Sequence, residues 1–325
     1  MLKAIILFAI GLVCLIKGGD WFVDGASALA RRFHLPELLI GATVVSIGTT
    51  LPEVMVSTMS AISGHGEIAY GNAIGSVICN AALIAAISIT VRPGDVDPKT
   101  LRTPVAFFFV AAAIYCIAAY GFGEFARPLG IIMLVVFAVY MFVNVKQMTG
   151  PNARQLEAHD DDEGEDEGMS LAKMIVFLIV GAALIAVGAK LLVDNGTIIA
   201  TGLGVPESVI ALTFVALGTS LPELVTAITA LAKGHSDLSL GNVIGANVFN
   251  LVLVSGCAVT ISPFAVPHSA QIMGMETSLV LEIPLMIGVM LLLSVPALLR
   301  RKLSRVQGIL LLAIYAAFVV FQFTM

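Results

Sequence analysis

The chain has 325 residues, of which 58% are hydrophobic and 12% are charged. Soluble domains carry about a quarter charged residues, so this sequence has too little charge to cover a water-facing surface. The formal net charge of −5 comes from one stretch, because seven acids lie between Asp160 and Glu167 and the rest of the chain is slightly basic. The composition excludes an ordinary soluble domain and predicts an integral membrane protein.

Apolar runs long enough to cross about 30 Å of hydrocarbon as helices recur along the whole chain. The first run leads directly into more apolar sequence, so we expect it to be retained as a helix rather than removed as a signal peptide. The expected spans are residues 2–30, 37–63, 68–90, 104–121, 127–147, 171–200, 207–232, 239–261, 277–298 and 306–324. The predicted fold is an all-α polytopic membrane protein with about ten transmembrane helices.

Spans 2–30 and 171–200 are longer than a bilayer requires, which predicts tilt or a bend. Both contain several glycines, which allow close helix contact, either as ordinary packing or as part of a moving element. The cysteines are scattered through apolar segments without metal-ligand spacing, so we expect free thiols and neither disulfides nor a zinc site. They are Cys14, Cys79, Cys116 and Cys257.

Lysine and arginine are concentrated in the connections that follow odd-numbered spans, including the run from Arg300 to Arg305. Positive charge favours cytoplasmic loops, so these connections are predicted to be cytoplasmic and both termini extracytoplasmic. The acidic stretch 150–170 is then a cytoplasmic linker. It is expected to be solvated and disordered, with weak regulatory cation binding as the alternative.

An internal repeat divides the chain in two. At a constant offset of 170 residues, residues 41–80 match residues 211–250 without a gap, and 14 of the 40 positions are identical. This indicates duplication, with five spans in each of the halves 1–149 and 171–325. Because five is odd, the second half must enter the membrane from the opposite side. Inverted repeats are a signature of secondary transporters, whose sites lie between the repeats.

The sharpest signal in the repeat is a pair of matched motifs. They are Gly48-Thr49-Thr50-Leu51-Pro52-Glu53 and Gly218-Thr219-Ser220-Leu221-Pro222-Glu223. A proline inside a helix gives no N–H to the carbonyl four residues earlier, so Pro52 and Pro222 are expected to free the carbonyls of Gly48 and Gly218. A carboxylate, a hydroxyl one turn before it and free carbonyls form a ligand set for a hard cation.

The two glutamates are the central prediction. An acid in mid-membrane costs about 2.5–3.5 kcal/mol, and two at matched positions are poorly explained by packing. We therefore interpret Glu53 and Glu223 as cation ligands, with a protonated glutamate bonded inside the bundle as the structural alternative.

A second matched element follows each motif, Gly71 to Asn80 and Gly241 to Asn250. Counting about 1.5 Å per residue from the intervening turn places Glu53 and Asn80 at nearly the same depth on neighbouring antiparallel helices. Asn80 and Asn250 are therefore predicted to add amide oxygens to the same centre, with helix–helix bonding as the alternative.

Three further matched pairs lie outside these two elements or near their ends. Asn72 and Asn242 are balanced between ligand and packing roles. His65 and His235 are expected at the interface or as helix caps. Asp24 and Asp194 are expected to cap, to pair with arginine or to line a vestibule.

With these motifs the chain resembles the cation/calcium exchanger superfamily, specifically its prokaryotic sodium/calcium exchangers. The resemblance rests on the motif G-T-[ST]-L-P-E, which occurs twice and is followed each time by G-N-x-[IV]-G. It implies an antiporter of the prokaryotic plasma (inner) membrane that alternates access as two long helices slide across a core. It also implies no enzymatic activity, no cofactor and no nucleic-acid partner; the partners are Ca²⁺, Na⁺ and the bilayer, and a monomer is expected.

The resemblance also implies which residues bind which ion. Glu53, Glu223, Thr49 and Thr219 would form the calcium site. Thr50, Ser220, Ser76, Asn80 and Asn250 would help to form flanking sodium sites.

Two positions depart from the family pattern, because Ala246 replaces a common serine and Asn250 a common aspartate. Two glutamates balance one Ca²⁺ or two Na⁺, so a third Na⁺ would leave an uncompensated charge in a low-dielectric site. A lower sodium stoichiometry or a different counter-ion is therefore expected. The alternatives are an H⁺-driven or K⁺-dependent Ca²⁺ antiporter and, more distantly, a cation channel. An intramembrane enzyme is disfavoured, since no nucleophile–base constellation or H-E-x-x-H motif is present.

Overall fold

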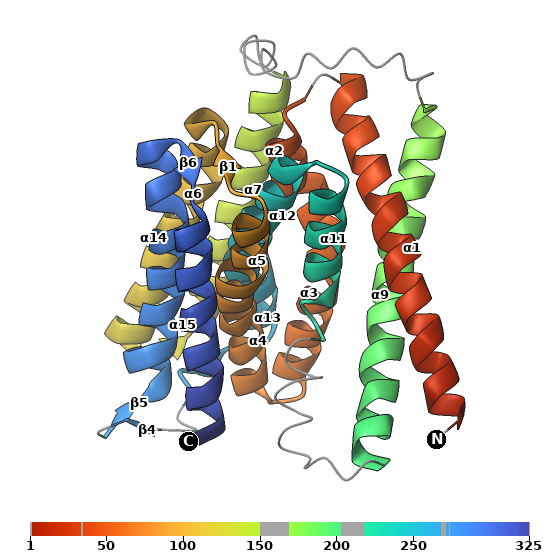
Figure 1. Cartoon of the computed structure of the whole chain (residues 1–325). Helices are drawn as coiled ribbons and strands as arrows, with labels where there is room; N and C mark the ends of the chain where they lie inside the picture. The colour runs from red at the N-terminus through yellow and green to blue at the C-terminus, as the bar shows by residue number, and fades with distance from the viewer. Residues whose placement is uncertain are drawn as a thin grey trace.

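The computed structural model describes residues 2–33, 35–149, 169–202, 218–267, 271–272 and 274–324. Within them, nine helices are long and apolar enough to cross a membrane, and a shorter apolar helix covers Leu221–Ala232. The first half of the seventh predicted span and the acidic stretch 150–168 lie outside the described residues. The described chain has the predicted all-α polytopic architecture (Figure 1).

Five spans form the first half. They are α1 (Leu2–Phe33); α2 (Glu37–Ile40), η1 (Gly41–Val45) and α3 (Ser46–Ile62); α4 (Gly66–Cys79), η2 (Asn80–Ile84) and α5 (Ala85–Val91); α6 (Pro98–Cys116) and η3 (Ile117–Phe122); and α7 (Arg127–Thr149). The fourth span begins six residues earlier than predicted, because Asp97 accepts a hydrogen bond from the Lys99 N–H and so caps α6 at its start.

The second half repeats this order. Its elements are α9 (Leu171–Gly202); α11 (Leu221–Ala232); α12 (Ser236–Phe249), η5 (Asn250–Val254) and α13 (Ser255–Ile261); η6 (Ser278–Glu282) and α14 (Ile283–Arg300); and α15 (Arg305–Thr324). The turns α3–α4 and α11–α12 match closely, since Gly64 and Gly234 both adopt positive φ angles of 83° and 92° that favour glycine.

The repeated elements form the centre of the bundle. In the spans Gly66–Val91 and Ser236–Ile261, 67% and 78% of the most apolar window is buried, against 28% in α1 and 22% in α9. Figure 1 shows α1 and α9 side by side at one edge of the molecule, away from α14 and α15. The bundle thus has a protected core of helices from both halves and a peripheral pair, α1 with α9.

Helices α1 and α9 pack against each other through glycines. Cβ atoms added at Gly11 and Gly18 would meet the backbone at Gly188 and Gly181, respectively, at 2.9 Å. Contacting residue numbers rise along α1 as they fall along α9, so the two helices are antiparallel. Contact this close between backbones makes the pair a single packed unit.

Short β-ladders also join the two halves. Antiparallel pairing connects β1 (Gly94–Asp95) with β6 (Lys302–Leu303), and β2 (Glu124–Phe125) with β3 (Phe264–Ala265). A third ladder, β4 (Gln271–Ile272) with β5 (Met275–Glu276), lies within the second half. Each of the first two ladders pairs a connection of one half with a connection of the other, so the halves are interlocked.

Within the described residues, five spans contain π-helical turns, which the sequence did not indicate. Two of them begin at the matched residues Asn80 and Asn250. A π-turn interrupts the regular α-helical ladder and is frequent at functional sites. Both asparagines therefore stand where the helix geometry changes.

The close approach between the halves generates a test of packing. A Cβ at Gly241 would collide with the Leu38 carbonyl, whereas a Cβ at its repeat mate Gly71 would meet open space. Gly241→Ala should destabilise the protein by about 1–3 kcal/mol through overpacking. Gly71→Ala should be neutral or slightly stabilising, because alanine favours helices. Thermal melts of the detergent-solubilised variants measure both; equal effects would contradict the packing described here.

Candidate ion-binding site

The two glutamate motifs occupy different parts of their helices. Pro52 lies inside α3, as predicted. Pro222 lies in the first turn of α11, and Gly218 lies in the turn before that helix. The prediction that Pro222 interrupts a helix interior is therefore wrong for the described residues, because a proline in the first turn removes no intrahelical hydrogen bond.

Both predicted carboxylates are fully buried, one from each half of the chain. Glu53 is on α3 and Glu223 on α11, with no exposed surface on either residue. The carboxyl groups are close enough to interact electrostatically. Thr50 Oγ1 donates to Glu223 Oε1 at 3.4 Å, which joins the motif of one half to that of the other. The structure thus brings the two motifs together.

The predicted serine ligands also meet across the two halves. Ser220, directly before α11, donates to Ser76 of α4, with 3.4 Å between the Oγ atoms. Both serines are buried. At the position that matches Ser76, the second half has the buried Ala246 and so offers no hydroxyl.

The asparagines Asn80 and Asn250 are fully buried at the starts of η2 and η5. Packing crosses between the halves, because η2 contacts α11 and η5 contacts α3. Each asparagine-bearing turn is therefore packed on the helix that carries the other half's glutamate.

Many polar atoms at these positions have no partner within the described part of the chain. They are both carboxylate oxygens of Glu53, Oε2 of Glu223, and the amide oxygen and nitrogen of Asn80 and Asn250. Leaving one buried polar group unsatisfied costs about 1–3 kcal/mol, and more for a charged group. Such a concentration of oxygen acceptors fits a bound cation that completes them.

The ligand chemistry is that of a hard cation. The described residues contain no cluster of three or more His, Cys, Asp or Glu side chains that could hold a metal. The site instead combines two carboxylates with hydroxyl and amide oxygens, which suit Na⁺ and Ca²⁺ and not a thiolate- or imidazole-binding metal.

Asn242 has a specific partner that the sequence did not reveal. Its Oδ1 accepts from Thr49 Oγ1 at 3.3 Å, and it is fully buried on α12. Ser46 lies 3.4 Å from the same oxygen, but its shorter bond, 2.8 Å, goes to the Gly41 carbonyl. A hydroxyl that donates its proton to an amide oxygen keeps its lone pairs for a cation. Asn242 therefore fixes the orientation of the Thr49 hydroxyl.

Its repeat mate, Asn72, makes different contacts. Asn72 Nδ2 donates to Ser57 Oγ at 2.8 Å and to the Glu53 carbonyl at 3.3 Å. Thr219, the mate of Thr49, is partly buried in the turn before α11. The two halves thus support their threonines differently, and only spatial information distinguishes them.

The remaining matched pairs lie away from this site. Asp24 pairs with Lys233, and Asp194 with Lys190. His65 and His235 occupy the N-cap positions of α4 and α12, as the capping alternative predicted, although neither side chain makes a capping hydrogen bond. His235 Nδ1 instead lies 2.8 Å from Glu37 Oε1. The His235 imidazole therefore contacts Glu37 and does not bond to the first turn of α12.

Inverted helical repeats with buried acids where they meet define the class of secondary transporters. The family described as sodium/calcium exchanger protein matches residues 3–146 and 173–324. The chain belongs to this family and, with it, to the cation/calcium exchanger superfamily, which confirms the resemblance seen in the motifs.

Similar proteins support the same assignment. The inner membrane protein YrbG of Escherichia coli is 36% identical over 272 residues, which cover 81% of each chain. The sodium/calcium exchanger MaX1 of Methanosarcina acetivorans is 29% identical over 98% of each chain. Among solved structures, the sodium-calcium exchanger NCX_Mj soaked with Na⁺ and Sr²⁺ superposes with a TM-score of 0.81, at 31% identity over 98% of each chain.

The Asn242–Thr49 bond predicts coupling between two variants. Asn242→Ala should weaken calcium binding about tenfold, the equivalent of about 1.4 kcal/mol, because Thr49 loses its proton acceptor. In a Thr49→Val background the same change should cost nothing further. Calorimetric titration with calcium measures the affinity of the wild type, the two single variants and the double variant. Ser46→Ala is the control and should bind normally; full additivity of the two changes would contradict the orienting role.

Proposed function

We propose that this protein exchanges Ca²⁺ for Na⁺ across the membrane by alternating access. The observation that carries the proposal is the meeting of Glu53 and Glu223, both fully buried, with three of their four carboxylate oxygens lacking a partner among the described residues. The family and the similarity to MaX1 and NCX_Mj support these ions as the substrates.

The calcium site in this proposal consists of Glu53, Glu223, Thr49 and Thr219, with the carbonyls of Gly48 and Gly218 as further oxygen donors. Sodium uses the flanking oxygens of Thr50, Ser220, Ser76, Asn80 and Asn250. Ca²⁺ takes six to eight oxygen ligands, so a set drawn from both halves can surround it. Sliding of the two long helices α1 and α9 across the core then opens the site to either side.

Charge explains why transport would be an exchange. Two ionised carboxylates in a low-dielectric core are unfavourable without a counter-charge. One Ca²⁺ or two Na⁺ neutralises them, whereas an empty ionised site keeps both charges. The loaded protein therefore changes conformation more readily than the empty one, and influx of one ion becomes tied to efflux of the other.

The topology belongs to the same proposal. The halves 1–149 and 171–325 are the two repeats, with motif segments 41–80 and 211–250, and residues 150–170 connect them in the cytoplasm. Both termini are extracytoplasmic, and the membrane is the prokaryotic inner membrane. Basic residues in the cytoplasmic connections support this orientation.

Replacing either site carboxylate should abolish transport. Glu53→Gln or Glu223→Gln removes one negative charge. A site with bound Ca²⁺ would then carry an uncompensated positive charge. Uptake of ⁴⁵Ca by sodium-loaded proteoliposomes should fall at least a hundredfold in each variant.

A matched control is available in Glu282, which lies in a membrane segment outside both motifs and bonds Gln322 at 3.3 Å. Glu282→Gln should retain uptake, because it is not part of the shared site. Wild-type uptake by either Glu53→Gln or Glu223→Gln would remove the site assignment.

The stoichiometry follows from the two charges. Exchange of two Na⁺ for one Ca²⁺ moves no net charge, so uptake should be insensitive to an imposed membrane potential. Asn250→Asp adds a third carboxylate, accommodates a third Na⁺ and should make uptake respond to the potential. Reversal-potential measurements in vesicles give the number of Na⁺ ions exchanged for each Ca²⁺. A clean three-sodium exchange by the wild type would overturn the two-sodium stoichiometry.

Parallel assays with only an H⁺ or a K⁺ gradient identify a different counter-ion.

A further inference from the structure

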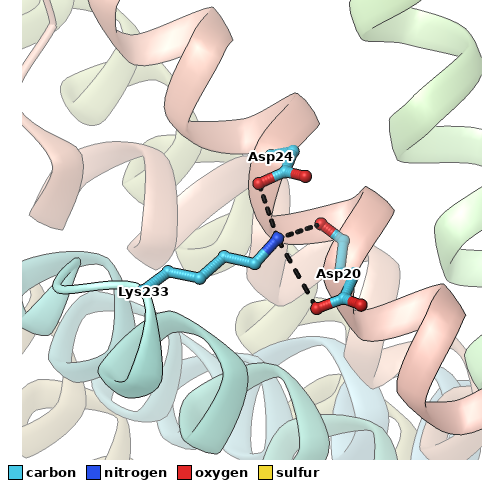
Figure 2. Close-up of polar contacts among 3 residues, drawn as sticks. All are labelled: Asp20, Asp24 and Lys233. Atoms are coloured by element: carbon cyan, nitrogen blue, oxygen red, sulfur yellow. Dashed lines mark hydrogen bonds and ion pairs between the residues drawn. The ribbon is translucent and has the colours of Figure 1, made fainter.

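A network of two ion pairs, formed by one lysine and two aspartates, joins the peripheral helix α1 to the turn between α11 and α12. Lys233 Nζ lies 2.7 Å from Asp24 Oδ1 and 3.5 Å from Asp20 Oδ1, and it also donates to the Asp20 carbonyl at 3.1 Å. Figure 2 shows the lysine reaching from the turn to both carboxylates, which lie one helical turn apart on α1. We call Lys233, Asp20 and Asp24 the Lys233 latch.

The latch connects the α1–α9 pair to the core of the bundle. Helices α1 and α9 are packed together through glycines and form, with parts of the neighbouring helices, a hydrophobic cluster around Leu15, Phe22 and Ile185. This cluster is separate from the larger one that fills the bundle core. Where α1 passes α11, the contact is made at Gly19, next to Asp20, where an added Cβ would meet Val225 and Thr229 at 2.8 Å. A smooth glycine contact offers little resistance to sliding.

Charges are arranged along α1 in a single strip. At 3.6 residues per turn, Lys17, Asp20, Asp24 and Arg31 lie within about 60° of one another around the helix. A shift of α1 by one turn, about 5.4 Å, would place Asp20 where Asp24 now lies. A larger shift in that direction would bring Lys17 toward Lys233, and a shift in the opposite direction would bring Arg31 toward it. The strip thus offers two attractive positions with a repulsive position on either side.

The other half of the molecule lacks this device. At the repeat offset of 170 residues, Lys190 and Asp194 of α9 match Asp20 and Asp24, and Ser63 matches Lys233. Lys190 and Asp194 pair with each other at 2.9 Å within one helix. A pair inside one helix cannot join two bodies, and Ser63 carries no charge. The latch is therefore present on one side of the molecule only.

Exposure makes the contact reversible. The side chains of Lys233, Asp20 and Asp24 are 28%, 36% and 43% exposed. An ion pair open to water contributes little compared with a buried one, so it can break and re-form during a cycle. His235 and Glu37, which pair with each other nearby, connect the same turn to α2 and so stay within the core.

We propose that the Lys233 latch sets the position of the α1–α9 pair along the bundle axis and favours the conformation described here over the one displaced by a turn. The proposal rests on the alternating-access function above, and it makes the conformational equilibrium unequal although the fold is nearly symmetric. The two carboxylates give the sliding helix two stops, and the flanking basic residues limit its travel.

The test measures the axial position of α1 directly. Spin labels are placed at Phe33→Cys, the last residue of α1, and at Glu67→Cys, in the first turn of the core helix α4. Figure 1 shows these two helix ends at opposite ends of the bundle. The four native cysteines are replaced in this background. A slide of α1 by one turn changes the distance between the two labels by roughly 5 Å. Pulsed electron–electron double resonance resolves such a difference as separate populations.

Lys233→Met should shift the ratio of the two populations about fivefold away from the wild-type position, which corresponds to about 1 kcal/mol. Asp24→Asn should produce a shift in the same direction, and the double variant should add little to either change. Lys233→Arg should keep the wild-type distribution. Lys190→Met is the matched control and should leave the distribution unchanged.

Indistinguishable distance distributions for Lys233→Met, Lys190→Met and the wild type would overturn the latch. Calcium uptake measured on the same proteins separates this failure from failure of the proposed function. If the wild type exchanges ions but Lys233→Met leaves the distribution of label distances unchanged, the latch is wrong and the function stands. If the wild type exchanges neither ion while Lys233→Met shifts α1, the latch holds and the function is wrong.

Discussion

The structure depends on two carboxyl groups that are buried together without a positive side chain to match them among the described residues. Glu53 and Glu223 come from separate halves of the chain and have no exposed surface. Among the described residues, the ion pairs involve Lys190, Lys233 and His235 and none of them includes either glutamate. Burying an unpaired charge is far more costly than the marginal stability of a protein allows. In the proposed function, a bound cation would balance both carboxylates, and this requirement would couple ion binding to conformational change.

The duplication supplies matching elements from both halves, and the two halves differ at a few positions. Each half contributes one glutamate motif and one asparagine-bearing π-turn, and each π-turn packs on the other half's glutamate helix. The symmetry is broken where Ala246 replaces the hydroxyl of Ser76, and where Asn242 orients Thr49 while Asn72 bonds elsewhere. It is broken again at Lys233. In the proposed alternating-access cycle, two equivalent halves would favour neither conformation, so we expect these few positions to decide which one predominates.

Much of the fold was predictable from sequence, because membrane spans and a gapless repeat are properties of pattern. Hydropathy located all nine long helices of the described part of the chain, and the repeat indicated that Glu53 and Glu223 are symmetry mates at one site. The π-turns at Asn80 and Asn250 were not predictable, since no residue type specifies them. Nor was the position of Pro222 in a first turn of helix, because proline is compatible with both a helix start and a kinked interior. The partners of Asn242 and Asp24 lie about 200 residues away, where sequence spacing carries no information.

The most direct test of the central claim is to locate the ion. Crystals of the protein soaked in Sr²⁺, a heavier analogue of Ca²⁺, would give an anomalous-difference map in which bound strontium stands out from light atoms. One strong peak within coordination distance of both Glu53 and Glu223 is the predicted result, and it should weaken as Na⁺ is added. A map with no peak between the two carboxylates, or with a peak bound only to other residues, would contradict it.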